Sequence, residues 1–378
     1  MRKVLFVTGT RADFGKLKPL IRVVNEMQTF SSEIFVTGMH LLQRFGSTWE
    51  EVVSSNLAPV HPFVNHSPGD RMETTLARTI NGLSSYVQES KPDVIVVHGD
   101  RVEALAGAVV GTLSNIRVAH IEGGEVSGTV DEALRHAVSK LSHWHFVSNE
   151  ESRGRLLQLG EASNDIFVIG SPDIDLMDSP DLPTLDEALT HYNIEWEEFG
   201  ILIFHPVTTE LENLERDSRE MMEALVSTED KIIVIESNND SGSEVIRKVY
   251  EDFEKYDQLR FFPSMRFEYF LTILRNAKYI VGNSSAGIRE APHYGVPAIN
   301  LGSRQNNRVN ARLVINVDIS KDAITEGLAR ASTLDKTPEH NFGTGRSAEG
   351  FRAILLEKSR WKKSLQKVFV DIPLPREG

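Results

Sequence analysis

The sequence predicts an α/β protein made of two Rossmann-like, doubly wound domains facing a cleft. Short apolar runs alternate with amphipathic stretches along nearly the whole chain, and this alternation occurs twice, with a Pro- and Asp-rich segment between the two series. The length of 378 residues also exceeds what one hydrophobic core usually serves. Continuous apolar strands alternating with helices are typical of a parallel sheet covered on both faces.

The first domain is predicted over residues 1–170. Its apolar runs predict strands, and its amphipathic stretches predict helices between them. The strands are expected at 3–8, 34–37, 94–98, 118–121, 145–148 and 166–169, and the helices at 16–27, 103–113, 130–141 and 150–159.

The second domain is predicted over residues 171–350 and follows the same pattern. The boundary falls near SPDIDLMDSPDLP, which is rich in Pro and Asp and poor in periodicity. A polar segment at 337–350 precedes a C-terminal helix at 351–378, which is expected to pack back on the first domain. The strands are expected at 201–205, 231–235, 260–262, 279–281, 298–301 and 314–317, and the helices at 214–226, 243–256, 266–276, 286–294 and 321–332.

The composition excludes several classes of protein. A formal charge of −13 and a pI near 5.5 argue against binding to nucleic acid or to an anionic membrane surface. The chain has no cysteine, which excludes disulfides and thiolate chemistry and fits a cytoplasmic location. No apolar run approaches the ~18 residues of a membrane span, and TGTRAD interrupts the apolar start of the chain, so a signal peptide is not expected.

Polar motifs follow the predicted strands of the first domain. TGTRADFG follows the first strand, where backbone N–H groups and Arg11 could hold an anion. The alternative is a plain turn in which Asp13 starts the helix. HGDR ends a very apolar strand, so Asp100 and Arg101 are placed where ligands bind in such sheets; alternatively, Asp100 only caps the next helix.

The motif HIEGGEVSGTVDE has both a structural and a functional interpretation. Thr129 and Glu132 have the spacing of a capping box, and Asp131 and Arg135 that of a helical ion pair. Glu122 is not explained in this way, because a carboxylate that ends an apolar strand is costly unless it is partnered. Glu122 is therefore a candidate for chemistry.

Two motifs of the second domain indicate a phosphate site. His205 ends the strand before FHPVTT and is either a structural histidine or a positive charge for a phosphate. In GNSSAGIRE, Ser284 and Ser285 precede a predicted helix, whose free N–H groups and two hydroxyls would bind an anion. Glu290 could accept the hydroxyls of a ribose; the alternative is a serine-capped helix.

Together these motifs resemble the hydrolysing UDP-N-acetylglucosamine 2-epimerases, in particular their bacterial sialic-acid-pathway branch, which is similar to the epimerase half of the bifunctional animal enzyme. The resemblance runs in order over nearly the whole chain. It rests on TGTRADFGKLKPL, VTGMH, HGDR, HIEGGEVSGTVDE, GSPDIDLM, FHPVTTE, FPS-RFEYF, GNSSAGIREAP and the Arg304-Gln305 pair. It implies a glycosyltransferase-B-like fold in which the second domain holds most of the UDP.

The resemblance also implies roles for individual residues. The catalytic candidates are Asp100, Glu122, Asp131 and His205. Relatives more often carry two aspartates where this chain has Asp131-Glu132, so only Asp131 is carried over. Nucleotide and phosphate contacts are expected from Arg11, Arg101, His205, Asn238, Ser284, Ser285, Glu290 and Arg304, and uracil contacts from Ser264, Met265 and Phe270.

The implied reaction converts UDP-N-acetylglucosamine and water to N-acetylmannosamine and UDP by anti elimination followed by syn addition of water. Asp100 is assigned to C2 proton transfer, and Glu122 and Asp131 to the addition. The alternatives are the same reaction on UDP-N,N′-diacetylbacillosamine, a UDP-sugar glycosyltransferase and a non-catalytic nucleotide-sugar sensor. No metal or nicotinamide cofactor is expected, since HExxH, GxxxxGK[ST] and a GxGxxG after the first strand are missing. Relatives suggest a homodimer or homotetramer.

Overall fold

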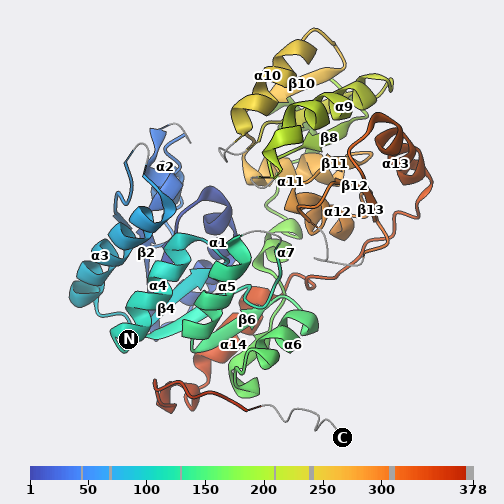
Figure 1. Cartoon of the computed structure of the whole chain (residues 1–378). Helices are drawn as coiled ribbons and strands as arrows, with labels where there is room; N and C mark the ends of the chain where they lie inside the picture. Colours follow the sequence, from blue (N-terminus) through green and yellow to red (C-terminus); the bar gives the residue numbers. More distant parts are fainter. Residues whose placement is uncertain are drawn as a thin grey trace, which may run out of the picture. The chain divides into compact units, whose positions relative to one another are not determined.

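The computed structural model describes residues 1–43, 46–67, 70–127, 130–207, 210–237, 242–305 and 311–371. The chain divides into two compact units. Unit 1 comprises Met1–Asp178 together with the chain from Phe342 onward, and unit 2 comprises Ser179–Asn341. Each unit is built around its own parallel sheet (Figure 1).

Unit 1 contains a seven-stranded parallel sheet of order β3-β2-β1-β4-β5-β6-β7. The order reverses direction between β1 and β4, which makes this the topological switch point of the sheet. The strands are β1 (Arg2–Thr8), β2 (Phe30–Val36), β3 (Val60–Pro62), β4 (Val94–His98), β5 (Arg117–Ile121), β6 (Trp144–Val147) and β7 (Ile166–Val168).

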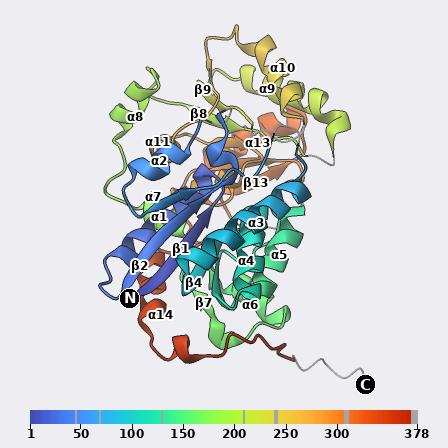
Figure 2. The same cartoon turned by 90° about the vertical axis from the view of Figure 1, so that its left-hand side faces the viewer.

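Helices cover both faces of this sheet. Successive residues of β1 point to opposite faces, so Val4 and Phe6 join the core on one side and Leu5 and Val7 the core on the other. The first core includes α1 (Arg11–Asn25) and α14 (Ser347–Leu356). The second includes α3 (Met72–Ser90), α4 (Val102–Leu113) and α5 (Val130–Leu141), which lie in succession in Figure 2. The remaining helices are α2 (Trp49–Ser54), α6 (Glu150–Gln158) and α7 (Pro172–Met177), with 3₁₀ turns η1 (Gly38–Leu41), η3 (Ser163–Asp165) and η6 (Arg360–Lys362).

The sequence pattern predicts no helix or strand in residues 49–90, where the structure has α2, β3 and α3. The long helix α3 buries only Thr79, Leu83 and Val87, so its apolar periodicity is weak. Strand β3 is three residues long and lies at the edge of the sheet, with two of its residues exposed. These elements lack the apolar signal on which the prediction depends.

Unit 2 contains a six-stranded parallel sheet of order β10-β9-β8-β11-β12-β13. Its strands are β8 (Gly200–Ile203), β9 (Ile232–Ile235), β10 (Leu259–Phe262), β11 (Ile280–Gly282), β12 (Ala298–Leu301) and β13 (Val314–Val317). Its helices are α8 (Leu185–His191), α9 (Leu214–Val226), α10 (Ser243–Phe253), α11 (Phe267–Arg275), α12 (Glu290–His293) and α13 (Lys321–Thr333), with 3₁₀ turns η4 (Leu211–Asn213) and η5 (Ser285–Gly287). Within the described ranges, no helix of either unit is long and apolar enough to cross a membrane.

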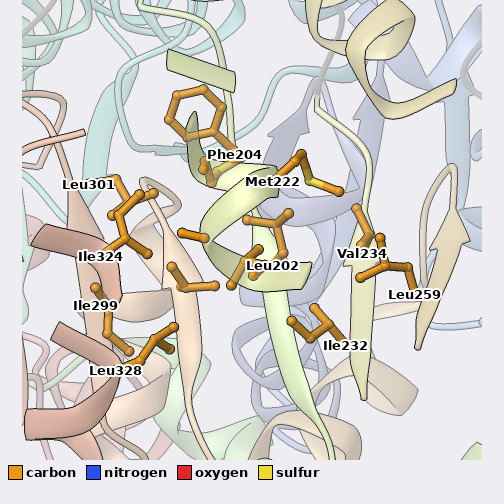
Figure 3. Close-up of a cluster of buried hydrophobic side chains, with 14 of the residues drawn as sticks. Leu202, Phe204, Met222, Ile232, Val234, Leu259, Ile299, Leu301, Ile324 and Leu328 are labelled. Atoms are coloured by element: carbon orange, nitrogen blue, oxygen red, sulfur yellow. The ribbon is translucent and has the colours of Figure 1, made fainter. Parts of the chain in front are cut away.

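The main core of unit 2 lies between its sheet and the helices α9, α10 and α13. Figure 3 shows this cluster: Leu202 and Val234 of the sheet lie near Met222, Ile232 lies below Leu202, and Ile299 lies near Leu328. Of these six side chains, all except Leu328 are at most 1 % exposed. Their continuous apolar runs are what made these strands predictable.

The units divide between Asp178 and Ser179, eight residues beyond the predicted boundary at 170/171 (178 − 170 = 8). The reason is that α7, with its cap Ser171, is bonded to unit 1: Ser171 N donates to Phe342 O at 2.7 Å, and Asp175 accepts from the N–H groups that start α14.

The predicted C-terminal helix at 351–378 is shorter in the structure, since α14 ends at Leu356. The following chain packs on unit 1 as a strap, defined here as residues 357–370. Its Trp361 contacts Trp144 edge to face, with ring centroids 5.0 Å apart, and Lys367 Nζ donates to Lys140 O at 2.9 Å and Glu161 Oε2 at 2.6 Å. Contacts of single side chains, rather than a helical repeat, fix this segment.

Candidate active site

The turn after β1 places Asp13 at the carboxyl edge of the unit 1 sheet. Thr10 caps α1, and its hydroxyl accepts from Asp13 N at 3.2 Å. The Asp13 carboxylate turns back and accepts from Gly9 N at 3.4 Å. The helix thus begins at Arg11, five residues before the predicted start (16 − 11 = 5), and Asp13 lies in its first turn rather than at its cap.

His98 joins Asp13 to Glu122 in the interior of the unit. Its Nδ1 lies 3.2 Å from Asp13 Oδ1, and its Nε2 lies 3.0 Å from Glu122 Oε2. Burial alone would lower the pKa of His98, but hydrogen bonds to two carboxylates outweigh it and raise the pKa to about 9. Burial likewise opposes the charge of Asp13, but His98 and the charge of Arg101 hold its pKa at about 2. His98 is therefore an imidazolium at neutral pH.

Glu122 is a buried carboxylate, only 2 % exposed, that receives three donors. Besides His98, Lys16 Nζ lies 3.2 Å from Oε2, and Ser171 Oγ donates to Oε1. Hydrogen bonds and nearby positive charges favour the ionised form of a carboxyl group. Its φ of +63° is uncommon outside glycine and is held by the backbone, since Glu122 N donates to Phe146 O at 2.8 Å. The backbone thus aims Glu122 into this network as an anion.

Lys16 connects the network to α7. Its Nζ lies 2.8 Å from Asp173 Oδ2, and Asp173 is almost fully buried. The sequence pattern predicts no role for Lys16, His98, Ser171 or Asp173. All four lie in motifs that carry the family resemblance, namely TGTRADFGKLKPL, HGDR and GSPDIDLM, but the pattern of GSPDIDLM favours a domain boundary and that of HGDR favours a strand end at His98.

Asp100 and Asp131 lie near two arginines. Arg135 donates to Asp100 Oδ2 and also, at 2.8 Å, to Glu122 O, so it links the carboxyl ends of β4 and β5. Burial opposes the charge of Arg101, but Glu103, Asp13, Asp100 and Asp131 raise its pKa.

Arg135 was expected to pair with Asp131 along the helix, whereas the structure turns it toward Asp100. Thr129 lies outside the described residues, and Glu132 accepts from Ser127 N at 2.9 Å.

Arg11 points toward a helix that the sequence analysis did not predict. Its Nε lies 3.0 Å from Glu51 Oε2 on α2, and Lys18 Nζ lies 3.1 Å from the other oxygen of the same carboxylate. A nucleotide contact by Arg11 stays a prediction.

In unit 2, the side chain of Asn283 fixes the backbone of His205. Asn283 Oδ1 accepts from His205 N at 2.7 Å, and its Nδ2 donates to His205 O at 2.8 Å. Asn283 O accepts in turn from Arg304 at 3.1 Å and Gln305 at 2.9 Å. The fully buried Asn283 therefore brings together the strand ends of β8 and β11 and the segment after β12. The resemblance named His205 and Arg304 for nucleotide contacts, but Asn283 received no role.

Of the two interpretations of His205, a structural histidine or a positive charge for a phosphate, its burial in the unliganded protein disfavours the positive charge. Burial lowers its pKa, and the positive charge of Arg304 lowers it further, to about 3. His205 is thus a neutral imidazole at physiological pH, and Arg304 is the cation beside it.

The Ser284–Ser285 motif forms a tight turn rather than the start of the predicted helix 286–294. The 3₁₀ turn η5 covers Ser285–Gly287, and α12 has only four residues, so little helix dipole is available. Ser284 Oγ accepts from Ala286 N at 3.3 Å, which leaves its O–H as a donor. Gly282 is required before the turn, because its φ is +129° and a Cβ there would collide with Ile203 O.

The other predicted nucleotide contacts lie in unit 2 or outside the described residues. Glu290, Met265 and Phe270 are buried, and Ser264 is exposed in the loop after β10. Phe270 lies on α11 with its ring 6.4 Å from that of Phe267. Asn238 lies outside the described residues.

In the part of the chain that the structure describes, no group of three or more His, Asp or Glu side chains could hold a metal ion.

Two parallel α/β units with polar side chains gathered at their strand ends define a protein of the glycosyltransferase-B-like fold class. The chain matches a solved structure of the Neisseria meningitidis UDP-GlcNAc 2-epimerase bound to UDP-GlcNAc, with a TM-score of 0.82 at 21% identity over 94% of this chain and all of that chain. The sequence model of the UDP-N-acetylglucosamine 2-epimerase family matches residues 22–356. The chain belongs to this family.

Two curated relatives bear different names. A UDP-N-acetylglucosamine 2-epimerase of Neisseria meningitidis serogroup B is 44% identical over 99% of this chain and 100% of its own length. A UDP-N,N′-diacetylbacillosamine 2-epimerase (hydrolyzing) of Legionella pneumophila is 35% identical over 92% of this chain and 94% of its own length.

Proposed function

We propose that the chain is a hydrolysing epimerase that converts UDP-N-acetylglucosamine and water to N-acetylmannosamine and UDP. The observation that carries the proposal is the pair of carboxylates at adjacent strand ends, in a chain of this family. Asp100 follows β4 and Glu122 follows β5, and each is bonded to a cation. Such a pair offers two fixed positions for proton transfer to one sugar ring.

The first step removes UDP. The C2–H bond is not adjacent to a carbonyl group, so it becomes acidic only as the C1–O bond breaks and positive charge builds on the ring. Asp100 takes the C2 proton, the C1–O electrons leave with the β-phosphate, and a 2-acetamidoglucal remains. Arg135 forms an ion pair with Asp100 and so holds its carboxylate in place for this role.

The second step adds water across the double bond from the opposite face of C2. Glu122 is ionised through His98, Lys16 and Ser171, so it is suited to accept a proton from the attacking water. The water oxygen bonds to C1. Asp131, in the first turn of α5, supplies the proton to C2. The product sugar therefore has the inverted configuration at C2.

Residues of unit 2 are assigned to the UDP. The hydroxyls of Ser284 and Ser285 and the Arg304 guanidinium supply donors and positive charge for the phosphates. His205 contributes as a neutral hydrogen-bonding group that can take up a proton as the β-phosphate gains charge. Glu290 is assigned to the ribose, and the segment around Met265 and Phe270 to the uracil.

Incubation of the protein with UDP-N-acetylglucosamine in heavy-oxygen, deuterated water tests the proposal. Elimination and addition cleave the C1–O bond, so UDP keeps its original oxygen and N-acetylmannosamine carries deuterium at C2. Heavy oxygen in UDP would show attack at phosphorus, and an original C2 proton in the product would show that no elimination occurred. UDP mass is the firmer readout, because the anomeric oxygen of a free sugar exchanges with water.

The same assay separates the other candidate functions. A glycosyltransferase would release little UDP without an acceptor, and a sensor would leave the nucleotide sugar intact. The relative from Legionella makes UDP-N,N′-diacetylbacillosamine the alternative substrate. Parallel reactions with the two nucleotide sugars at equal concentration identify the substrate by the larger kcat/KM.

The biological setting follows from the same resemblance. We assign the chain to the cytoplasm, as a homodimer or homotetramer that supplies N-acetylmannosamine for sialic acid biosynthesis. Light scattering of the purified protein measures the oligomeric state directly.

A further inference from the structure

Glu103 is a buried carboxylate that the proposed mechanism does not use. It lies in the first turn of α4 and is only 4 % exposed. Its Oε2 is buried without a hydrogen-bond partner among the described residues. Its one ion pair is with Arg101, whose Nε lies 3.6 Å from Oε2, beyond hydrogen-bond distance.

The position of Glu103 is that of a ligand site. Order in the sheet reverses between β1 and β4, and ligands of doubly wound sheets bind outside the strand ends at that point. Glu103 follows β4, and its carboxylate packs against Gly9, which follows β1, and Gly38, which follows β2. A Cβ on Gly9 would lie 2.9 Å from Glu103 Cδ, and one on Gly38 would lie 2.6 Å from Oε1. Glycine backbone thus leaves just enough room for this carboxylate.

A buried carboxylate oxygen without a donor, such as Glu103 Oε2, is unfavourable, because it has lost its water and gained no hydrogen bond in return. Other carboxylates at this edge are satisfied: Asp13 by His98 and Gly9, and Glu122 by His98, Lys16 and Ser171. Glu103 is the exception among these three. A carboxylate only accepts hydrogen bonds, so a ligand that satisfies Glu103 Oε2 must bring a donor.

We propose that Glu103 binds the sugar of the substrate by accepting a hydrogen bond from one of its ring or exocyclic hydroxyls. This inference rests on the proposed function, which assigns C1 and C2 to Asp100, Glu122 and Asp131. The hydroxyls at C3, C4 and C6 are then the sugar hydroxyls left for Glu103. A site built to pair with a hydroxyl strongly rejects an analogue that lacks it, so Glu103 is a specificity-determining residue.

The test is calorimetric binding of UDP, UDP-N-acetylglucosamine and its 3-deoxy, 4-deoxy and 6-deoxy analogues to wild type, Glu103→Gln and Glu103→Met. Wild type should bind at least one analogue roughly 10²-fold more weakly than the parent nucleotide sugar. Glu103→Met has no acceptor, so it should bind that analogue and the parent with affinities within about tenfold of one another. Glu103→Gln keeps one acceptor oxygen, so its discrimination between that analogue and the parent should lie between those of wild type and Glu103→Met.

UDP itself serves as the folding control, because it lacks the sugar and should bind all three proteins equally. Glu150→Gln on the surface of α6 is the matched carboxylate control and should keep the wild-type discrimination. If Glu103 had a purely structural role, its replacement would weaken the binding of all nucleotide sugars alike. The ratios of their affinities would then stay unchanged. Unchanged ratios in Glu103→Met, or equal binding of every analogue by wild type, would overturn the proposal.

The binding measurement does not depend on turnover, so the two proposals fail separately. If UDP-N-acetylglucosamine binds with the expected discrimination but is not converted, the epimerase function fails and the Glu103 contact stands. If it is converted but Glu103→Met discriminates as wild type does, only the contact fails. If the sugar adds nothing to UDP binding in wild type, the Glu103 contact is overturned, and conversion of UDP-N-acetylglucosamine alone decides the epimerase function.

Discussion

His98 Nε2 lies 3.0 Å from Glu122 Oε2, with both side chains buried at adjacent strand ends of one sheet. The second ring nitrogen of His98 contacts Asp13, so a single imidazolium joins two anions. This arrangement fixes the orientation of Glu122 as well as its charge, because a hydrogen bond on each side of the ring prevents the imidazole from turning.

The first prediction is that His98 stabilises unit 1 in a pH-dependent way. Its pKa is raised from 6.5 to about 9 on folding, so its contribution is complete below about pH 6.5 and is lost as the pH rises through 9. Replacement of His98 by Gln should lower the free energy of unfolding by roughly 2–3 kcal/mol at pH 6 and by little at pH 10. Denaturant titrations at several pH values measure this difference.

The reporter for that experiment is tryptophan fluorescence in a Trp196→Phe background. Trp196 belongs to unit 2, whereas Trp49, Trp144 and Trp361 belong to unit 1. His136→Gln, at a half-buried histidine on α5, is the matched control. A pH-independent loss in His98→Gln would show that the side chain acts by packing alone.

The second prediction concerns Asp100. Asp100→Asn keeps the shape of the side chain but removes the proton acceptor, so kcat should fall by roughly 10²–10⁴. UDP affinity should change little. Arg135→Lys is a second variant that tests the same site. It keeps the positive charge near Asp100 but loses the forked contact to both Asp100 and Glu122 O. We therefore expect kcat to fall while KM stays nearly constant. Normal turnover of Asp100→Asn would remove Asp100 from the mechanism.

The third prediction concerns the protonation of His205. In the free protein its imidazole should stay neutral down to about pH 3, as followed by the NMR signal that disappears in His205→Gln. Arg304→Gln should raise the pKa, because it removes a repelling charge, but should not restore 6.5, since burial is the larger cause. Titration of His205 near pH 6.5 in the wild type would contradict the buried, neutral state.

The fourth prediction concerns the strap. Lys367→Met keeps the aliphatic stem but leaves Lys140 O and the buried Glu161 carboxylate without one donor, which should destabilise unit 1 by roughly 2–4 kcal/mol. Lys362→Met, at an exposed lysine of η6, should change stability by less than about 0.5 kcal/mol. Equal stability of the two variants in denaturant titrations would show that the strap does not depend on Lys367.

The fifth prediction concerns cofactors. The sequence has neither a nicotinamide fingerprint after its first strand nor a dense metal-ligand motif, so activity should survive exhaustive chelation and should not respond to added nicotinamide nucleotide. Loss of turnover on chelation, with recovery on adding a divalent ion, would contradict this.

The sequence by itself determined the parallel α/β architecture and the strand ends that carry polar side chains. VIVV before His98 and YIV before Gly282 are apolar on every residue because both faces of the sheet are covered, and that signal is local. The motifs also predicted the family, and Asp100, Glu122, Ser284 and Ser285 were named from their place after a strand.

The tertiary structure alone decided which partners these residues have. Lys16, His98, Glu122 and Asp173 come from four separate segments, and only the order β1-β4-β5 and the packing of α7 on α1 bring them together. The same holds for the charge of His205, which depends on burial and on Arg304 after another strand. A hydrogen bond and a desolvated charge depend on distances in space, and the sequence pattern carries no such distances between remote segments.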